Sequence, residues 1–201
     1  MIKTFKRYGM YGSVRLFISL IFSKLLISTK IRIVRIPFYI RGSKYIKWGD
    51  NLTSGINLRI DADPIDPFQN NFVLTIGNNV QFNDYVHIGA VQNVVIGNNV
   101  LIGSKVFISD HNHGIYTGID QSFPENEPSN RTIHSSPVFI EDNVWLGEHV
   151  SILAGVTIGK GSVIGANSVV SKNIPPNSIA VGIPAKIIKQ FNYATNRWER
   201  I

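Results

Sequence analysis

The chain contains no cysteine among its 201 residues. This absence excludes a disulfide framework, a thiolate nucleophile and a metal site with cysteine ligands. Acids are nearly missing from residues 1–50, which hold eleven Lys and Arg but only Asp50, for a net charge of +10; residues 51–201 hold nine bases and twelve acids, for −3. The basic part predicts contact with an anionic surface. Nucleic acid is not expected as that partner, because no nucleic-acid-binding motif accompanies the charge.

The chain also lacks an uninterrupted apolar run of the roughly 20 residues that cross a bilayer. Its most apolar stretch, residues 14–27, is shorter and contains Arg15 and Lys24, so it predicts a helix that does not span a membrane. No small-residue cleavage site of a signal peptide follows it. Two compatible roles stay open for this helix. It covers the open end of the remaining fold or packs between subunits, or it lies at a membrane interface with its bases on lipid phosphates.

What the chain has in abundance is a six-residue repeat. An aliphatic or aromatic residue recurs in phase at twelve positions, which are Ile76, Phe82, Ile88, Ile96, Ile102, Ile108, Ile140, Leu146, Ile152, Ile158, Ile164 and Val170. A second, smaller residue precedes most of these by two positions, which places both side chains on one face of a short strand. Turn formers that tolerate positive φ, such as Gly77-Asn78, lie between the strands. A period of six fits neither an α-helix nor the longer strands of a β-sandwich, and it is typical of a β-helix.

The repeat divides the chain into three parts. Residues 1–47 form a basic segment with helical and extended pieces, residues 48–181 form the β-helix, and residues 182–201 form a tail that we expect to end as a helix. Two extra residues in 90–95 predict a bulge in one coil. Residues 109–137 leave the coil as a protruding loop that contains histidines and acids, and a long loop on a rigid repeat commonly carries function.

Five local motifs accompany the repeat. They are Lys6-Arg7-Tyr8-Gly9-Met10-Tyr11-Gly12, Ser109-Asp110-His111-Asn112-His113-Gly114, Val144-Trp145-Leu146-Gly147, Gly182-Ile183-Pro184-Ala185-Lys186 and Trp198-Glu199-Arg200-Ile201. With the repeat, they resemble the hexapeptide-repeat acyltransferases, and most nearly the O-acetyltransferases of lipopolysaccharide and O-antigen biosynthesis. The resemblance covers nearly the whole chain. It implies an all-β fold, a left-handed parallel β-helix, assembled as a homotrimer that uses acetyl-CoA. The handedness follows from the resemblance alone, because parallel crossovers are otherwise almost always right-handed.

Acyl transfer from a thioester to a sugar hydroxyl requires a base for the hydroxyl proton, donors for the oxyanion and a channel for CoA. Histidine is the natural base at neutral pH, and no serine or cysteine nucleophile is needed when the two substrates react directly. The resemblance assigns the base to His111, while His113 is expected to orient the sugar. The candidates that hold the imidazole tautomer are Asp110, Glu125, Glu127 and Glu148.

The resemblance also implies binding residues. Asn83 and Asp84 match a coil region that lines the acceptor cleft, although turn formation explains them equally well. Trp145 occupies an outward position and is expected to flank the acetyl-CoA arm. Backbone N–H groups near Gly147 and Glu148 are candidate oxyanion donors. The remaining cofactor-binding candidates, for which ordinary surface positions are the alternative, are Ala166, Ser171, Lys172 and Lys186. Two outward histidines, His87 and His149, receive no role.

The resemblance therefore implies a cytoplasmic acetyl-CoA-dependent enzyme that acetylates a sugar or lipid-linked saccharide of bacterial surface polysaccharide, O-antigen or capsule. Contact with the inner face of the cytoplasmic membrane would run through residues 1–47. The alternative is N-acetylation of a nucleotide-linked amino sugar. A zinc site between subunits, as in γ-class carbonic anhydrases, is not expected because the five histidines lack that spacing, so we predict no metal. A solenoid that only binds would not need the histidine- and acid-rich loop.

Overall fold

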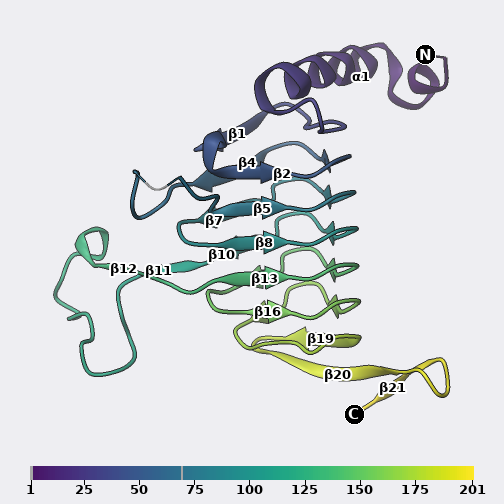
Figure 1. Ribbon diagram of the computed structural model, residues 1–201. Helices are drawn as coiled ribbons and strands as arrows, with labels where there is room; N and C mark the ends of the chain where they lie inside the picture. Colours follow the sequence, from purple (N-terminus) through teal and green to yellow (C-terminus); the bar gives the residue numbers. More distant parts are fainter. Residues whose placement is uncertain (1, 69) are drawn as a thin grey trace.

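Short strands stack into a left-handed parallel β-helix with three faces in the computed structural model, which describes residues 2–68 and 70–201 (Figure 1). The first face contains β2 (Ile46–Trp48), β5 (Leu74–Ile76), β8 (Val94–Ile96), β13 (Val138–Ile140) and β16 (Thr157–Ile158). The second face contains β3 (Thr53–Ser54), β6 (Gln81–Phe82), β9 (Leu101–Ile102), β14 (Trp145–Leu146) and β17 (Val163–Ile164). The third face contains β1 (Phe38–Arg41), β4 (Leu58–Ala62), β7 (His87–Ala90), β10 (Phe107–Ser109), β15 (Ser151–Ile152) and β18 (Val169–Val170). The predicted fold class is confirmed.

The strands stack so that equivalent repeat positions meet. On the third face, Ile60 pairs with Ile88, Ile88 with Ile108, and Ile108 with Ile152, and all four side chains are fully buried. Each coil donates its backbone N–H groups to the carbonyls of the next, as from Gln81 to Val100 at 2.9 Å. The apolar residues of the repeat therefore form one continuous core inside the coil.

The residues with positive φ in the turns differ from those predicted. The positive φ lies on asparagines such as Asn79 (58°) and Asn99 (57°), and their side chains form a ladder in which Asn79 Nδ2 donates to Asn99 Oδ1 at 3.1 Å. Gly77 does not need positive φ. It lies so close to the next coil that a Cβ atom there would come within 2.5 Å of the Gly97 carbonyl oxygen. Glycine is required there by close stacking of the backbone.

The N-terminal segment begins with helix α1 (Ile2–Phe22), followed by a π-helical turn, η1 (Ser23–Ile27). The second half of α1 covers the open end of the coil (Figure 1). There, Arg15 donates to the Ile36 carbonyl through Nε (3.2 Å) and Nη2 (2.6 Å), and the buried Ser23 hydroxyl accepts the Val34 N–H at 2.7 Å. The coil itself starts before residue 48, because β1 already pairs with β4.

The helix is longer than predicted. It begins at Ile2, upstream of the apolar stretch, although Gly9 (φ 67°) interrupts its geometry. The helical stretch Phe5–Ile27, of 23 residues, is long and apolar enough to cross a membrane, by length and composition only. The expectation that it is too short was therefore wrong.

Two further segments depart from the coil. Residues 110–137 project from the stack and carry the antiparallel pair β11 (His111–His113) and β12 (Ile133–Ser135), together with a short 3₁₀-helix, η3 (Pro128–Asn130). A second 3₁₀-helix, η2 (Ser43–Tyr45), lies outside this excursion and precedes β2. The end of the C-terminal tail was predicted to be helical, which is wrong. The chain ends in three antiparallel strands, β19 (Ser178–Gly182), β20 (Ala185–Asn192) and β21 (Arg197–Arg200), called here the C-terminal hairpin. The side chains of β20 alternate between half-buried and exposed, a strand pattern with period two.

Candidate active site

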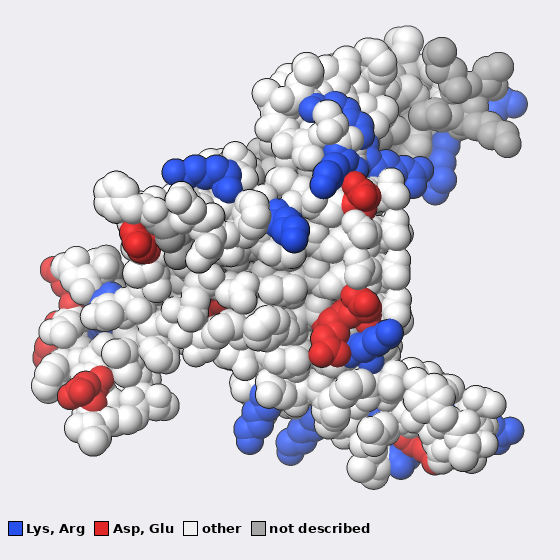
Figure 2. Space-filling model, viewed as in Figure 1, with Lys and Arg blue, Asp and Glu red and all other residues white. Residues whose placement is uncertain are grey.

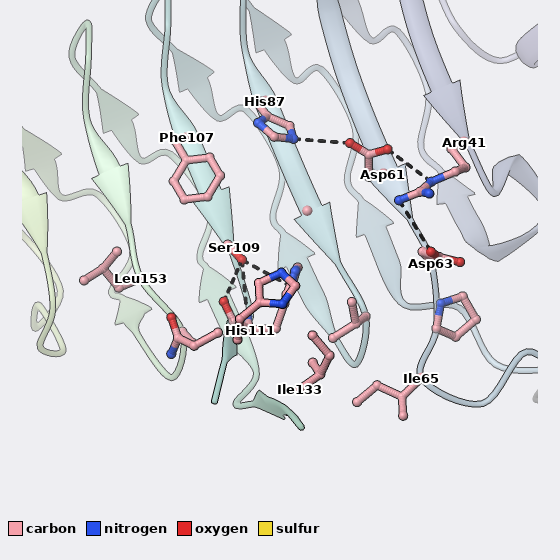
Figure 3. A pocket seen from close by; sticks show the side chains of 16 residues that line it. Arg41, Asp61, Asp63, Ile65, His87, Phe107, Ser109, His111, Ile133 and Leu153 are labelled. Atoms are coloured by element: carbon pink, nitrogen blue, oxygen red, sulfur yellow. Dashed lines mark hydrogen bonds and ion pairs between the residues drawn. The ribbon is translucent and has the colours of Figure 1, made fainter. Parts of the chain in front are cut away.

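A cleft of 660 Å³ lies where the excursion leaves the third face of the coil. The outward side chains of β4, β7 and β10 form its floor, and the strand pair β11–β12 forms one wall (Figure 3). His111 lines the cleft with its side chain 21% exposed, and His113 lines it as well. The two imidazole rings lie edge to face with their centroids 6.4 Å apart. The structure thus brings together the predicted base and the residue predicted to orient the sugar.

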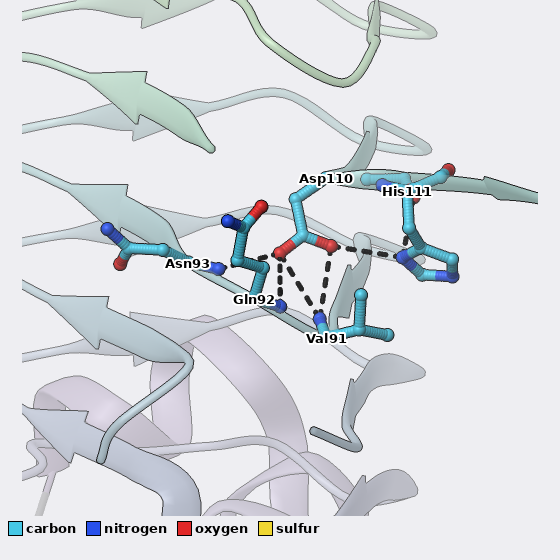
Figure 4. A network of polar contacts seen from close by, with 6 residues as sticks. Val91, Gln92, Asn93, Asp110 and His111 are labelled. Atoms are coloured by element: carbon cyan, nitrogen blue, oxygen red, sulfur yellow. Dashed lines mark hydrogen bonds and ion pairs between the residues drawn. The ribbon is translucent and has the colours of Figure 1, made fainter. Parts of the chain in front are cut away.

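Asp110 anchors His111 from the interior of the protein. Its carboxylate is fully buried and accepts the backbone N–H groups of Val91 (3.0 Å), Gln92 (2.8 Å) and Asn93 (2.8 Å) (Figure 4). These donors belong to the predicted bulge, so the two extra residues of that coil serve to bind a carboxylate. Asp110 Oδ1 also lies 3.0 Å from His111 Nδ1.

The protonation states of this pair follow from its surroundings. Burial raises the pKa of Asp110, but the hydrogen bonds from His111 and from the Gln92, Val91 and Asn93 backbone outweigh burial, and the pKa lies below its ordinary value. Asp110 is therefore ionised at neutral pH and can only accept hydrogen bonds. Nδ1 of His111 must carry the proton in that bond, which leaves Nε2 as the basic nitrogen. This is the tautomer that a general base requires.

Small residues let the imidazole lie against the coil. Gly89, directly below, has no side chain, and a Cβ atom there would lie 3.2 Å from His111 Cε1. The Ser109 hydroxyl accepts the His111 N–H at 3.3 Å and lies 3.2 Å from Nδ1. Among the candidates to hold the ring, Asp110 is the one in contact; Glu125 and Glu127 do not line the cleft, and Glu148 follows β14 on the second face.

A second carboxylate–imidazole pair lies in the same cleft. His87 Nε2 is 3.3 Å from Asp61 Oδ2, which also accepts Arg59 Nε at 2.7 Å (Figure 3). The other oxygen, Oδ1, lies 3.2 Å from Arg41 Nε but is buried without a hydrogen bond of good geometry. Burial raises the pKa of Asp61, yet the hydrogen bonds and charges of its neighbours, Arg59 first, keep the pKa below its ordinary value.

Sequence reasoning missed this second pair. The signal was the outward phase of His87 combined with the register of the coils, which places His87 beside Arg59 on one side and Phe107 on the other. The imidazole and phenyl rings of His87 and Phe107 lie 5.4 Å apart. When the period of the repeat is known, outward residues at equivalent positions of successive coils can therefore be predicted to be neighbours.

The other predicted residues lie away from this cleft. Asn83 and Asp84 line a different cleft, between α1 and the second face. Trp145 stands on the second face and is 51% exposed. Ala166, Ser171, Lys172 and Lys186 are exposed near the C-terminal coils. One chain therefore carries the predicted base and Trp145 on different faces, while Ser171 and Lys172 follow β18 of the third face.

One candidate role is corrected by the hydrogen bonds. The Gly147 N–H donates to the Ile164 carbonyl of the next coil at 2.8 Å, so it is not free to hold an oxyanion. This bond belongs to the ladder that stacks the coils, which recruits the backbone of the turns along with that of the strands. Within residues 2–68 and 70–201, no group of three or more His, Asp or Glu is arranged to hold a metal ion.

Comparison with known proteins gives consistent matches. Residues 137–172 match the family "Bacterial transferase hexapeptide (six repeats)". The chain is 46% identical to an Escherichia coli K12 protein named "Putative lipopolysaccharide biosynthesis O-acetyl transferase WbbJ", over 99% of this chain and 98% of that protein. It is similar in structure to the hexapeptide-repeat acetyltransferase VCA0836 of Vibrio cholerae, complexed with acetyl coenzyme A (28% identity, TM-score 0.54, 81% of this chain and 69% of that one).

A galactoside acetyltransferase in complex with coenzyme A is also similar, at 33% identity and a TM-score of 0.51 over 78% of this chain and 60% of that one. The alignment with the Escherichia coli protein includes the N-terminal segment, the coil and the C-terminal hairpin, because it spans nearly all of both chains. Together with the six-residue coil and its histidine cleft, these matches establish that the chain belongs to the hexapeptide-repeat acetyltransferases.

Proposed function

We propose that this enzyme transfers the acetyl group of acetyl-CoA to a sugar hydroxyl of bacterial surface polysaccharide, with His111 as the general base. The observation that carries the proposal is the buried Asp110, which holds His111 as a base at the wall of a cleft. His111 Nε2 takes the hydroxyl proton as the sugar oxygen attacks the thioester carbonyl. A C–O bond forms, the C–S bond breaks, and the imidazolium returns the proton to the departing CoA sulfur. The name of the Escherichia coli relative and the CoA-bound related structures support this choice of substrates.

The assembly completes the site in this proposal. Trp145 stands on the second face, while His111 belongs to the excursion beside the third. We propose a homotrimer in which His111 of one chain faces the Trp145 region of the next. Trp145 flanks the pantetheine arm, and Lys172 and Lys186 bind CoA phosphates through charge-assisted hydrogen bonds.

We further propose a cytoplasmic enzyme that is peripheral at the inner face of the membrane. The support is the outer surface of the N-terminal helical stretch, where Tyr11 is 81% exposed, Phe17 64% and Leu25 78%. Bases on the same segment would contact anionic headgroups while these side chains enter the acyl boundary.

The first prediction separates the two histidines of the cleft. His111→Ala should lower kcat by roughly 10²–10⁴ in an acetyl-CoA consumption assay, the usual contribution of general acid–base catalysis, with acetyl-CoA affinity little changed. His113→Ala is the matched control, since it removes an imidazole from the same strand, and it should act mainly on the KM of the acceptor. Near-normal turnover by the His111 variant, with loss of turnover in the His113 variant, would reverse the assignment.

Asp110→Asn tests the anchor of the base. Because the folded-state pKa lies below the unfolded one, Asp110 stabilises the fold fully above about pH 4 and loses that contribution as pH falls through the folded value. The variant should lose about 2–3 kcal/mol of unfolding free energy at pH 7, together with most of its kcat, and the stability gap should narrow below about pH 4. Urea denaturation across this pH range measures the gap. The exposed Asp120→Asn is the control, and a gap independent of pH contradicts an ionised Asp110.

The shared site predicts complementation between chains. His111→Ala and Trp145→Ala proteins should each be weakly active alone. Mixed trimers from co-expression should regain about a quarter of wild-type activity, because one interface in four combines both intact residues when chains assemble randomly. Mixtures without recovery, or an active monomer in sedimentation equilibrium, would rule out the shared site.

The membrane proposal predicts salt-sensitive binding. The protein should sediment with anionic vesicles at low salt and detach at high salt, because each base near the surface contributes about 1 kcal/mol and salt screens it. Replacing Phe17 and Leu25 by Ser should abolish sedimentation without lowering thermal stability, since both side chains are exposed. Failure to bind at low salt would eliminate the membrane contact, and retention through alkaline carbonate extraction would indicate a spanning helix instead.

A further inference from the structure

A second cleft, of 790 Å³, lies between α1 and the second face of the coil. Arg7, Tyr8, Leu16 and Leu20 of the helix form its roof. Its floor consists of the outward residues of the first coils, which include Thr53, Gln81, Asn83 and Asp84. The segment that links helix and coil adds Arg32 and Arg35. The cleft thus combines three guanidinium groups with the two residues that the family resemblance implicates in acceptor binding.

These arginines are not neutralised within the chain. Within residues 2–68 and 70–201, no ion pair involves Arg7, Arg32 or Arg35. Asp84 is the acid that lines the cleft, and its Oδ1 is occupied by the Ile56 N–H at 2.8 Å. Three guanidinium charges against one carboxylate leave a net charge of +2. Figure 2 shows Lys and Arg side chains gathered around the N-terminal helix and the first coils.

One of the arginines is held in place before any ligand arrives. The half-buried Arg35 donates from Nη1 to the Ser54 carbonyl at 2.6 Å, which leaves its other N–H donors for the cleft. Arg32 is exposed at the rim, and the Arg7 guanidinium lies 5.6 Å from the Tyr8 ring centroid. Arginine forks match the oxygens of phosphate groups, whereas neutral sugar hydroxyls do not require a cationic site.

We propose that this cleft binds the diphosphate group that links the acceptor sugar to its carrier. The inference rests on the proposed function and names its substrate class: an activated, diphosphate-linked saccharide. The predicted CoA residues lie on later coils, from β14 (Trp145) to β20 (Lys186), so the CoA phosphates would not compete for these arginines. The apolar roof of Tyr8, Leu16 and Leu20 adjoins the charged group and contacts the carrier next to the diphosphate.

Two carriers share this chemistry, a nucleoside diphosphate and a polyprenyl diphosphate. Equilibrium dialysis of the full chain with labelled uridine diphosphate and labelled farnesyl diphosphate provides one arm for each carrier. Uridine and farnesol are the matched probes without phosphate. The proposal is supported if either diphosphate binds more tightly than its phosphate-free counterpart and if this binding weakens with salt. The diphosphate that binds more tightly identifies the carrier.

The variants Arg7→Gln, Arg32→Gln and Arg35→Gln should each weaken diphosphate binding about tenfold, as expected for the loss of a charged hydrogen-bond donor. Lys30→Gln is the matched control. It removes one positive charge from the same segment without lining the cleft, and it should change binding less than twofold. Arg7 and Arg32 are exposed, so their variants keep the test valid if Arg35→Gln unfolds. Equal effects of all four variants, equal binding of the phosphate-free probes, or competition by CoA would overturn the proposal.

Turnover separates this inference from the function on which it rests. Acetyl transfer to a methyl glycoside without phosphate should be unchanged in the Arg7 and Arg32 variants, while the KM for a diphosphate-linked sugar rises about tenfold. Wild-type turnover of both acceptors with no response to the arginine variants would refute the cleft alone. Arginine-dependent diphosphate binding with no acetyl-CoA consumption on any acceptor would refute the acetyl transfer and leave the cleft supported.

Discussion

Backbone hydrogen bonds between successive coils are the interaction on which this structure depends. A single coil cannot bury its apolar residues, because its strands are only two to five residues long. Stacking with every repeat in register closes the core and also aligns the outward side chains in columns. Arg59, His87 and Phe107, far apart in sequence, become neighbours in this way. The coil therefore determines the spacing of the residues that form the floor of the active-site cleft.

Much of this fold could be predicted because the constraint repeats. Each hexad requires the same feature, an apolar residue that faces inward. Twelve positions that agree therefore indicate the fold even though each short segment alone has an ambiguous secondary structure. His111 could be found because its motif stands where the repeat breaks, and Asp110 was among its candidate partners. The choice of Asp110 over three glutamates needed the structure, since the donors of Val91, Gln92 and Asn93 come from another coil and are main-chain groups without a sequence signature.

The unpredicted features lie where no repeat constrains the chain. Helix α1 begins twelve residues before the apolar stretch, at Ile2 instead of Val14, and continues past Gly9 and Gly12, which intrinsic propensity disfavours in a helix. The end of the C-terminal tail was expected to be helical, but it is the strand β21, which pairs with β20. Asp61, which two prolines follow in the sequence, lies within β4 (Leu58–Ala62), and its side chain contacts His87. For β21 and Asp61, pairing with a neighbouring strand decides the structure, and local composition does not reveal that partner.

The chemistry of this protein is concentrated at the points where the repeat is interrupted. In a uniform coil every turn has the same outer surface, so no single position along the stack would bind a ligand selectively. The two extra residues in 90–95 create the N–H cluster for Asp110, and the excursion that follows places His111 above it. At the end of the stack, α1 leaves a cleft over the second face that both Arg7 and Asn83 line. The regular part supplies a rigid frame, and each irregularity adds a polar or charged group that the core could not accommodate.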